Sequence, residues 1–156
     1  MNFQTPRCQI RFFQEKDLER FMAYRNNLEW MQYQGFKGLS KEEYQAFLFT
    51  PRKLEEGQQF AIADKTWDLL IGDVYLQKAG GEYWLGYTIH PDFARQGLAR
   101  EVASGVLKWL TTQGATVVKA GVMPENQPSI DLLVSLGFTY LTEEDGGWLF
   151  IKKLVQ

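Results

Sequence analysis

A predicted strand, a short turn and a predicted helix follow one another from Tyr83 to Gln113, and this unit constrains the fold more than any other stretch. Its first part, YWLGYTI over Tyr83–Ile89, is rich in aromatic and β-branched residues, which favours a strand. After the turn, apolar residues recur at helical spacing: Leu98, Val102, Val106, Trp109 and Leu110. A further strand is predicted over residues 116–122 (TVVKAGV). We therefore expect two parallel strands joined by a right-handed crossover.

The turn between strand and helix, HPDFARQGLARE, is suited to hold a phosphate group. The start of a helix leaves backbone N–H groups unpaired and carries a partial positive charge. Gly97 and Ala99 keep this start free of bulky side chains, while Arg95 and Arg100 add positive charge. A P-loop would need Gly-Lys-Ser/Thr, and a dinucleotide fingerprint would need three spaced glycines with a later acidic residue. Neither pattern occurs at this turn.

Composition limits the protein class and its partners. The 156 residues are 45% hydrophobic and 15% aromatic, which predicts a folded protein with one domain over residues 1–156. The net charge of −2 argues against nucleic acid or an anionic membrane as a partner. Cys8 is the only cysteine, so no disulfide forms within the chain and a cytoplasmic location is expected. We find no apolar run long enough for a signal peptide or a membrane span.

The remaining chain predicts a mixed α/β fold. Strands are expected over residues 8–13, 59–64, 69–76, 138–142 and 148–154, the last four as two hairpins. Asp17 is predicted to cap one helix, and Ser40 opens a second with a capping box that ends at Glu43. A short helix over residues 127–136 stops at Gly137. Residues 26–38 are aromatic and irregular.

Two motifs, in this order, carry a family resemblance. Ala94–Ala99 (ARQGLA) matches the pattern Gln/Arg-x-x-Gly-x-Gly/Ala at its fourth and sixth positions and departs at the first, Ala94. Asn126–Phe138 then has an Asn, a short helix and a Gly-Phe pair at matching spacing. Together they resemble the GNAT acetyltransferases over about residues 8–154. The variant Gln-Gly-Leu-Ala is similar to the branch that acetylates the N-termini of ribosomal proteins.

The resemblance implies a central, mostly antiparallel sheet in which the fourth and fifth strands are parallel and splay apart. Coenzyme A would lie in the gap, with its pyrophosphate on the backbone of Gln96–Arg100 and its pantetheine arm along the open strand edge. No metal is implied. The residues expected to bind the coenzyme are Tyr87, Thr88, Ile89, Arg95, Gln96, Gly97, Leu98, Ala99, Arg100 and Asn126.

The catalytic residues depart from the common family pattern. Many members have a Tyr seven residues after the Asn, where this chain has Leu133. The ribosomal-protein branch resembles this chain in having Ser129, whose hydroxyl would face the sulfur as proton donor. That branch also has a Glu before its Gly-Tyr pair, where Trp84 and Leu85 stand here. Glu82 is the nearest acid, and we take it as the candidate base.

Each assignment has a structural alternative. Asn126 is also a favoured helix cap, and Ser129 can satisfy a first-turn backbone group. Glu82 beside two glycines can be a solvated turn residue. His90 before a proline needs no chemical role, and Cys8 has no base beside it in sequence. Three aromatic residues can line an acceptor pocket or pack in the core: Trp30, Tyr33 and Phe36.

We therefore predict transfer of an acetyl group from acetyl-coenzyme A to a primary amine, by direct attack in a ternary complex. A protein N-terminus is one possible acceptor, and the chain is expected to act as a monomer or a homodimer. One alternative is acetylation of a polyamine, an amino acid or an antibiotic. Another is a catalytically silent sensor module that binds coenzyme A.

Overall fold

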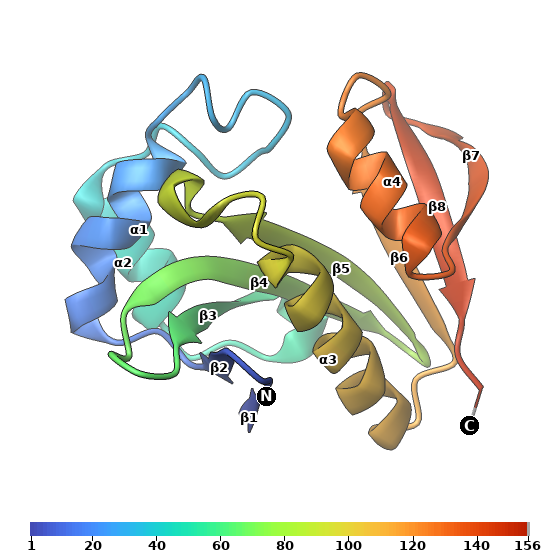
Figure 1. The fold of residues 1–156 in the computed structure, drawn as a ribbon, viewed down its shortest axis with the longest axis horizontal. Coiled ribbons are helices and arrows are strands. Elements are labelled where there is room, and N and C mark those ends of the chain that lie inside the picture. Colours follow the sequence, from blue (N-terminus) through green and yellow to red (C-terminus); the bar gives the residue numbers. More distant parts are fainter. Residues whose placement is uncertain (156) are drawn as a thin grey trace.

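A computed structural model describes residues 1–155 of the chain. Within this range the strands are β1 Phe3–Gln4, β2 Cys8–Arg11, β3 Gln58–Asp64, β4 Leu70–Ala79, β5 Glu82–Ile89, β6 Val117–Val122, β7 Thr139–Glu144 and β8 Gly147–Lys153. They form one sheet in the order β1-β2-β3-β4-β5-β6-β8-β7 (Figure 1). Every neighbouring pair is antiparallel except β5 and β6, which are parallel. The predicted mixed α/β fold and its parallel strand pair are confirmed.

Helices cover both faces of the sheet. The helices are α1 Leu18–Arg25, α2 Lys41–Phe49, α3 Leu98–Thr112 and α4 Gln127–Ser135. One hydrophobic cluster joins Val106 of α3 and Leu133 of α4 to the sheet, and it includes Phe60 of β3. A second cluster joins α1 and α2 to Ala61. Since adjacent strand residues point to opposite faces, α3 and α4 lie on one face and α1 and α2 on the other.

The helix starts agree only in part with the capping predictions. The capping box at Ser40 is confirmed, because the N–H of Glu43 donates to its Oγ at 3.2 Å and Ser40 N–H donates to Glu43 at 3.1 Å. Asp17 stands at the predicted N-cap position of α1, but its side chain makes no capping hydrogen bond to that helix. Its carboxylate instead accepts from the N–H of Gln14 at 2.8 Å and pairs with Arg11 at 2.7 Å. The Asp17 carboxylate thus forms an ion pair with a strand residue instead of a hydrogen bond to the first turn of the helix.

A buried ion pair fastens α1 to the centre of the sheet. Arg25, which is 4% exposed, reaches Asp73 of β4 at 2.5 Å and the hydroxyl of Thr88 in β5 at 3.3 Å. Gln59 donates to the same carboxylate at 2.8 Å, and the Tyr24 hydroxyl also donates to it. Burial lowers the pKa of Arg25, but Asp73 more than offsets this, so the net shift is upward. The guanidinium therefore remains charged.

The same guanidinium holds the irregular segment between α1 and α2, residues 26–40. Arg25 donates to the backbone carbonyls of Gly35 at 3.1 Å and Phe36 at 3.3 Å. Phe36 has a positive φ of 53° and packs against the rings of Phe21 and Tyr44. One buried charge thus sets the position of this segment above the sheet.

Two of the predictions concern the chain as a whole, namely the lack of a membrane span and the single domain. No helix in residues 1–155 is both long enough and apolar enough to cross a bilayer. The single-domain assignment for residues 1–156 stays a prediction.

Replacing Asp73 with alanine should destabilise the fold by about 3–5 kcal/mol, because it leaves the Arg25 charge buried without its carboxylate. Urea unfolding followed by circular dichroism measures this loss. Asp92→Ala is the matched control, since the Asp92 side chain is 82% exposed and its removal should change little. An Asp73→Ala midpoint equal to the wild-type midpoint would contradict the role given to this pair.

Candidate functional site

The parallel strands β5 and β6 pair over only part of their length. Glu82, Tyr83 and Trp84 pair with Val117–Lys119, and no pairing follows after Trp84. From there β6 pairs only with β8, and β5 only with β4. The predicted splay is present, and it leaves one edge of β5 open from Leu85 to Ile89.

The open edge presents backbone groups of alternate residues. The N–H of His90 donates to Ile71 in β4 at 2.8 Å. Backbone groups along a strand point alternately to its two sides. Those of Ile89 and Tyr87 therefore point away from β4, toward the splay. These are the N–H and C=O groups that an extended ligand can pair with.

A cavity of about 480 Å³ lies along this edge. Its walls come from the end of β5, the loop before α3, the first turn of α4 and residues 29–34. The lining residues predicted to bind coenzyme are Tyr87, Thr88, Ile89, Arg95, Gly97, Leu98, Ala99, Arg100 and Asn126. Ser129 lines it as well. Thus nearly all of the residues predicted to bind coenzyme are brought to one cavity.

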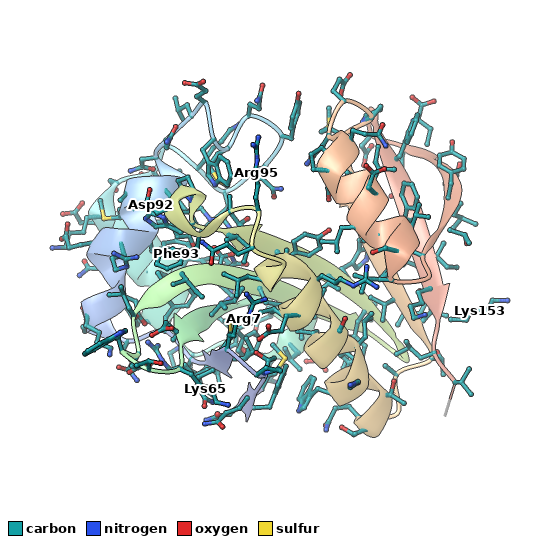
Figure 2. The ribbon with its side chains drawn as sticks, viewed as in Figure 1. Arg7, Lys65, Asp92, Phe93, Arg95 and Lys153 are labelled. Atoms are coloured by element: carbon teal, nitrogen blue, oxygen red, sulfur yellow. The ribbon has the colours of Figure 1, made fainter. Side chains whose placement is uncertain are left out.

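The loop before α3 has an unusual backbone that the sequence did not predict in detail. Arg95 has a φ of +61° and Gly97 a φ of +76°, both in the left-handed region. Gly97 stands at the N-cap of α3 without a capping side chain, so the N–H groups of the first turn stay free for a ligand. Figure 2 shows the Arg95 side chain extending from this loop toward residues 26–40.

Arg7 supports this loop, and sequence reasoning missed it. Its guanidinium donates to the carbonyl of Gln96 at 2.9 Å and to Glu101 at 2.7 Å. Thr5 also donates to Glu101, at 2.6 Å, and these hydrogen bonds outweigh burial to lower the pKa of that carboxyl. Glu101 lies in the first turn of α3, where its charge would repel a phosphate. Arg7 neutralises it, and no local sequence signal links two residues so far apart.

Tyr87 and Ser129 face each other across the cavity. Their hydroxyl oxygens are 3.1 Å apart and share a hydrogen bond. Burial raises the pKa of Tyr87, and the hydrogen bond to Ser129 opposes this only partly. The phenol therefore stays protonated at neutral pH. Asn126 caps α4 by accepting from the N–H of Ser129 at 3.4 Å, and this fixes where the serine lies.

Trp30 already occupies part of the open edge. Its indole Nε1 donates to the carbonyl of Ile89 at 3.0 Å. Trp30 and Tyr33 both line the cavity, so these two aromatic residues belong to the site rather than to the core. Phe36 instead packs in the cluster under α1 and α2.

Other predicted residues lie away from the cavity or point elsewhere. Glu82 stands at the far end of β5, paired with Lys119 at 2.7 Å, and it does not line the cavity. Gln96 is not among the lining residues, and its backbone carbonyl accepts a hydrogen bond from Arg7. The Thr88 hydroxyl faces Arg25 on the opposite face of the sheet. Leu133, at the common Tyr position, is buried in the core.

His90 and Cys8 have structural surroundings. The Nδ1 of His90 accepts from the N–H of Asp92 at 3.1 Å, and its ring packs on Tyr24 and Phe93. Burial, with Arg20 nearby, lowers the pKa of His90. Burial likewise raises the pKa of the Cys8 thiol, which keeps it protonated. In the described chain no three His, Cys, Asp or Glu side chains gather as around a metal ion.

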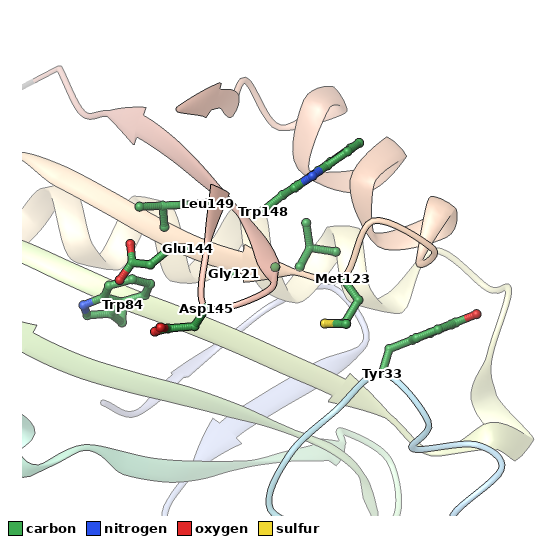
Figure 3. A pocket seen from close by; sticks show the side chains of 10 residues that line it. Tyr33, Trp84, Gly121, Met123, Glu144, Asp145, Trp148 and Leu149 are labelled. Atoms are coloured by element: carbon green, nitrogen blue, oxygen red, sulfur yellow. The ribbon is translucent and has the colours of Figure 1, made fainter. Parts of the chain in front are cut away.

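A second, smaller cavity of about 250 Å³ opens beside the splay (Figure 3). It is lined by Tyr33, Trp84, Gly121, Val122, Met123, Glu144, Asp145, Gly147, Trp148 and Leu149. Trp84 shares a face of β5 with Thr88, whereas Tyr87 points to the other face. Trp84 lines only the smaller cavity and Tyr87 only the larger one, so the two cavities border the splay at different points along β5, and Tyr33 lines both.

Comparison with known proteins identifies the family. The acetyltransferase (GNAT) domain matches residues 7–139, which is most of the chain. The chain belongs to the GNAT acetyltransferase family. It is therefore an acetyl-coenzyme A-dependent N-acetyltransferase, as its motifs indicated.

Three known proteins illustrate the similarity of this chain to the GNAT family. The uncharacterised N-acetyltransferase YnaD of Bacillus subtilis is 27% identical over 140 residues, covering 88% of this chain and 82% of YnaD. A GNAT-family acetyltransferase from Bacillus anthracis has a TM-score of 0.84 at 21% identity, with 98% of both chains covered. The ribosomal L7/L12 α-N-protein acetyltransferase RimL, solved with coenzyme A, also gives 0.84, at 14% identity and 99% and 98% coverage. The two solved structures share the fold.

Replacing Ala99 with leucine should weaken coenzyme A binding at least tenfold, or about 1.4 kcal/mol. The longer side chain would fill space beside the free N–H groups of α3, while leucine remains a good helix former. Gly97 is a poorer target, since its positive φ would add backbone strain to any substitution. Isothermal titration calorimetry gives the affinity. Thr112→Leu, at the exposed end of α3, is the control, and unchanged affinity in Ala99→Leu would contradict this placement.

Proposed function

We propose that the acetyl group passes directly from acetyl-coenzyme A to a primary amine while both substrates are bound. The observation that carries this is that two cavities with separate walls border one splay and share Tyr33. Such an arrangement lets a thioester and an amine meet without an acetylated enzyme. Holding two reactants in this way lowers the entropic part of the barrier.

Acetyl-coenzyme A takes the larger cavity in this proposal. The pyrophosphate binds the free N–H groups at the start of α3, with positive charge from Arg95 and Arg100. The pantetheine arm pairs with the backbone of Tyr87 and Ile89 at the open edge. This places the sulfur toward Ser129, beyond the phosphate end of the cavity.

The reaction then needs no enzyme nucleophile. The lone pair of the neutral amine forms a bond to the carbonyl carbon, and the bond from that carbon to sulfur breaks. The nitrogen loses one proton to solvent, and the sulfur gains one to leave as the free thiol. The hydroxyl of Ser129, hydrogen-bonded to Tyr87, donates toward the departing sulfur. Tyr87 orients and polarises that hydroxyl.

A general base is not part of this proposal. Glu82 forms an ion pair with Lys119 and lies outside the larger cavity, so it does not act as the base in this reaction. Deprotonating an α-amine with a pKa near 8 costs about 1.4 kcal/mol at pH 7, whereas a lysine with a pKa near 10.4 costs about 4.6. A protein N-terminus therefore suits this site better than a lysine side chain. We place the reaction in the cytoplasm because Cys8 is the only cysteine.

Thiol release from acetyl-coenzyme A, measured with a thiol-reactive dye across a panel of amines, tests the proposal. Release that depends on the amine supports direct transfer. Binding of coenzyme A without release on any amine would overturn it and favour a sensor module. Release without an amine would indicate simple hydrolysis and would also count against it.

Ser129→Ala should lower kcat by about 10–100-fold and leave KM for acetyl-coenzyme A nearly unchanged. Tyr87→Phe should have a smaller effect in the same direction. Because the two hydroxyls act through one hydrogen bond, the double variant should be little slower than Ser129→Ala. Steady-state kinetics on one amine measures all three. Ser104→Ala on α3 is the control. Additive losses in the double variant would show that the two hydroxyls act independently, which would contradict the prediction.

The rate should rise with pH as the amine loses its proton, because only the neutral amine attacks. It should not fall between pH 7 and 9, since the raised pKa of Tyr87 keeps the phenol protonated there. At pH 7, a peptide with a free N-terminus should react faster than the same peptide blocked at its N-terminus and carrying one lysine. A higher kcat/KM on the lysine peptide would refute this preference.

A further inference from the structure

The loop of residues 90–97, which joins β5 to α3, begins with a turn that the side chain of His90 closes. The imidazole Nδ1 accepts from the N–H of Asp92 at 3.1 Å. Two backbone hydrogen bonds complete the turn. The N–H of Phe93 donates to the His90 carbonyl at 2.9 Å, and the N–H of Ala94 donates to the carbonyl of Pro91 at 3.2 Å. His90 therefore supplies two of the three acceptors that hold this turn.

The ring of His90 is buried between the loop and α1. It packs edge-on against the ring of Phe93, with 5.8 Å between the ring centres, and against the ring of Tyr24, with 5.6 Å. Because Tyr24 belongs to α1, the turn lies against this helix (Figure 1). The backbone N–H of His90 donates to Ile71 in β4 at 2.8 Å. Backbone and ring are thus both fixed, and Nδ1 stays where it accepts from Asp92.

The chain directly after this turn has a strained backbone. Arg95 has a φ of +61°, a conformation that costs free energy for a residue with a side chain and persists only where its surroundings hold it. On one side, Arg95 follows the turn closed by His90. On the other side, Arg7 donates to the carbonyl of Gln96. Arg95 and the two residues before it line the larger cavity, so the shape of this wall depends on both attachments.

The hydrogen bond that closes the turn requires an uncharged imidazole. A neutral imidazole accepts at one nitrogen, whereas an imidazolium carries a proton on both nitrogens and accepts at neither. Protonation of His90 would therefore set an Nδ1–H group against the N–H of Asp92 in place of a hydrogen bond. The conformation of the turn is thus linked to the charge of one side chain.

The groups around His90 favour its neutral form on balance. Burial lowers the pKa of the imidazole, and Arg20 of α1 lowers it further. The Asp92 carboxylate, 3.9 Å from Nδ1, opposes them but is mostly exposed and offsets them only in part. Tyr24 of α1 is uncharged, because burial raises its pKa, and its hydroxyl donates to Asp73 of β4. Protonation of the ring therefore requires a pH below its ordinary pKa of about 6.5.

We infer that the neutral imidazole of His90 positions the loop of residues 90–97 for coenzyme A, and that protonation of this ring weakens coenzyme binding. His90 does not line the larger cavity, so it acts through the backbone of this loop. The inference rests on the proposed function, because it takes the pyrophosphate to bind at the start of α3. Charge attraction alone would have the opposite sign, since an imidazolium attracts the negative charge of the coenzyme. The direction of the pH dependence therefore distinguishes the two effects.

Two variants separate the hydrogen bond of His90 from its packing. His90→Asn keeps an acceptor for the N–H two residues further on and carries no charge. His90→Phe keeps a ring between Tyr24 and Phe93 but has no acceptor. By calorimetry at about pH 7.5, His90→Phe should bind coenzyme A about 3–10-fold more weakly than the wild type, and His90→Asn should retain most of the affinity. Equal affinity in His90→Phe and the wild type would overturn the inference.

The pH dependence of binding tests the charge state. Dephospho-coenzyme A is the probe, because it lacks the phosphate monoester of coenzyme A, which itself titrates at about pH 6. Between about pH 7.5 and about pH 5, the wild type should lose about threefold or more in affinity relative to His90→Asn. Asp92→Asn removes a carboxylate that favours the imidazolium, so it should move this loss to lower pH. A wild-type affinity that runs parallel to that of His90→Asn, or rises relative to it in acid, would overturn the inference.

His90 is the only histidine in the chain, so NMR follows its titration without interference. Binding and protonation are reciprocal, and a ligand that prefers the neutral ring must lower the pKa of His90 in the complex. Attraction between the coenzyme charge and the imidazolium would instead raise this pKa. An equal or higher pKa of His90 in saturating dephospho-coenzyme A would therefore count against a positioning role.

Direct binding keeps this test separate from the proposed function, because calorimetry and NMR need no acetyl transfer. If no amine releases thiol, but the His90 variants bind the coenzyme as expected here, direct transfer fails and the role of His90 stands. If amines release thiol and Ala99→Leu weakens coenzyme binding, but both His90 variants match the wild type at every pH, the reaction stands and the role of His90 fails.

Discussion

The buried ion pair between Arg25 and Asp73 is the interaction on which the site depends. It joins α1 to β4, reaches Thr88 in β5, and holds the carbonyls of residues 35 and 36. Separating these charges inside the protein would be costly, so the surrounding elements stay in one arrangement. Residues 29–34, which line the larger cavity, are part of the segment that this pair fastens. The buried ion pair thus supports a wall of the larger cavity that is formed by residues without regular secondary structure.

The second requirement is that β5 and β6 separate where they do. Three residues of pairing keep the strands in one sheet, and the unpaired remainder gives the backbone edge and the space beside it. The β7–β8 hairpin continues the sheet on the far side, so its tip also borders the opening. One local loss of hydrogen bonding therefore leaves an open backbone edge with one cavity along it and a second cavity beside it.

The sequence predicted the regular framework well, because periodicity and turn residues act over short distances. The unit of β5, α3 and β6, the glycine loop and the Asn126 region all lie where the pattern indicated. Contacts between distant segments were not predictable in the same way. Arg7 supports a loop far along the chain, and Asp17 pairs with a strand residue instead of capping its helix. Glu82 looked like the nearest acid in sequence, but in the fold Lys119 holds it at the wrong end of β5.

The hydrogen bond from Trp30 to Ile89 has a consequence for turnover. A ligand arm that pairs with this edge replaces an indole that is already bonded there, so it exchanges one partner for another. Its net gain is the difference between two hydrogen bonds rather than the whole of one. When the arm dissociates, the indole N–H can donate to this carbonyl again. The edge is thus protected from pairing with another strand while the indole is bonded to it.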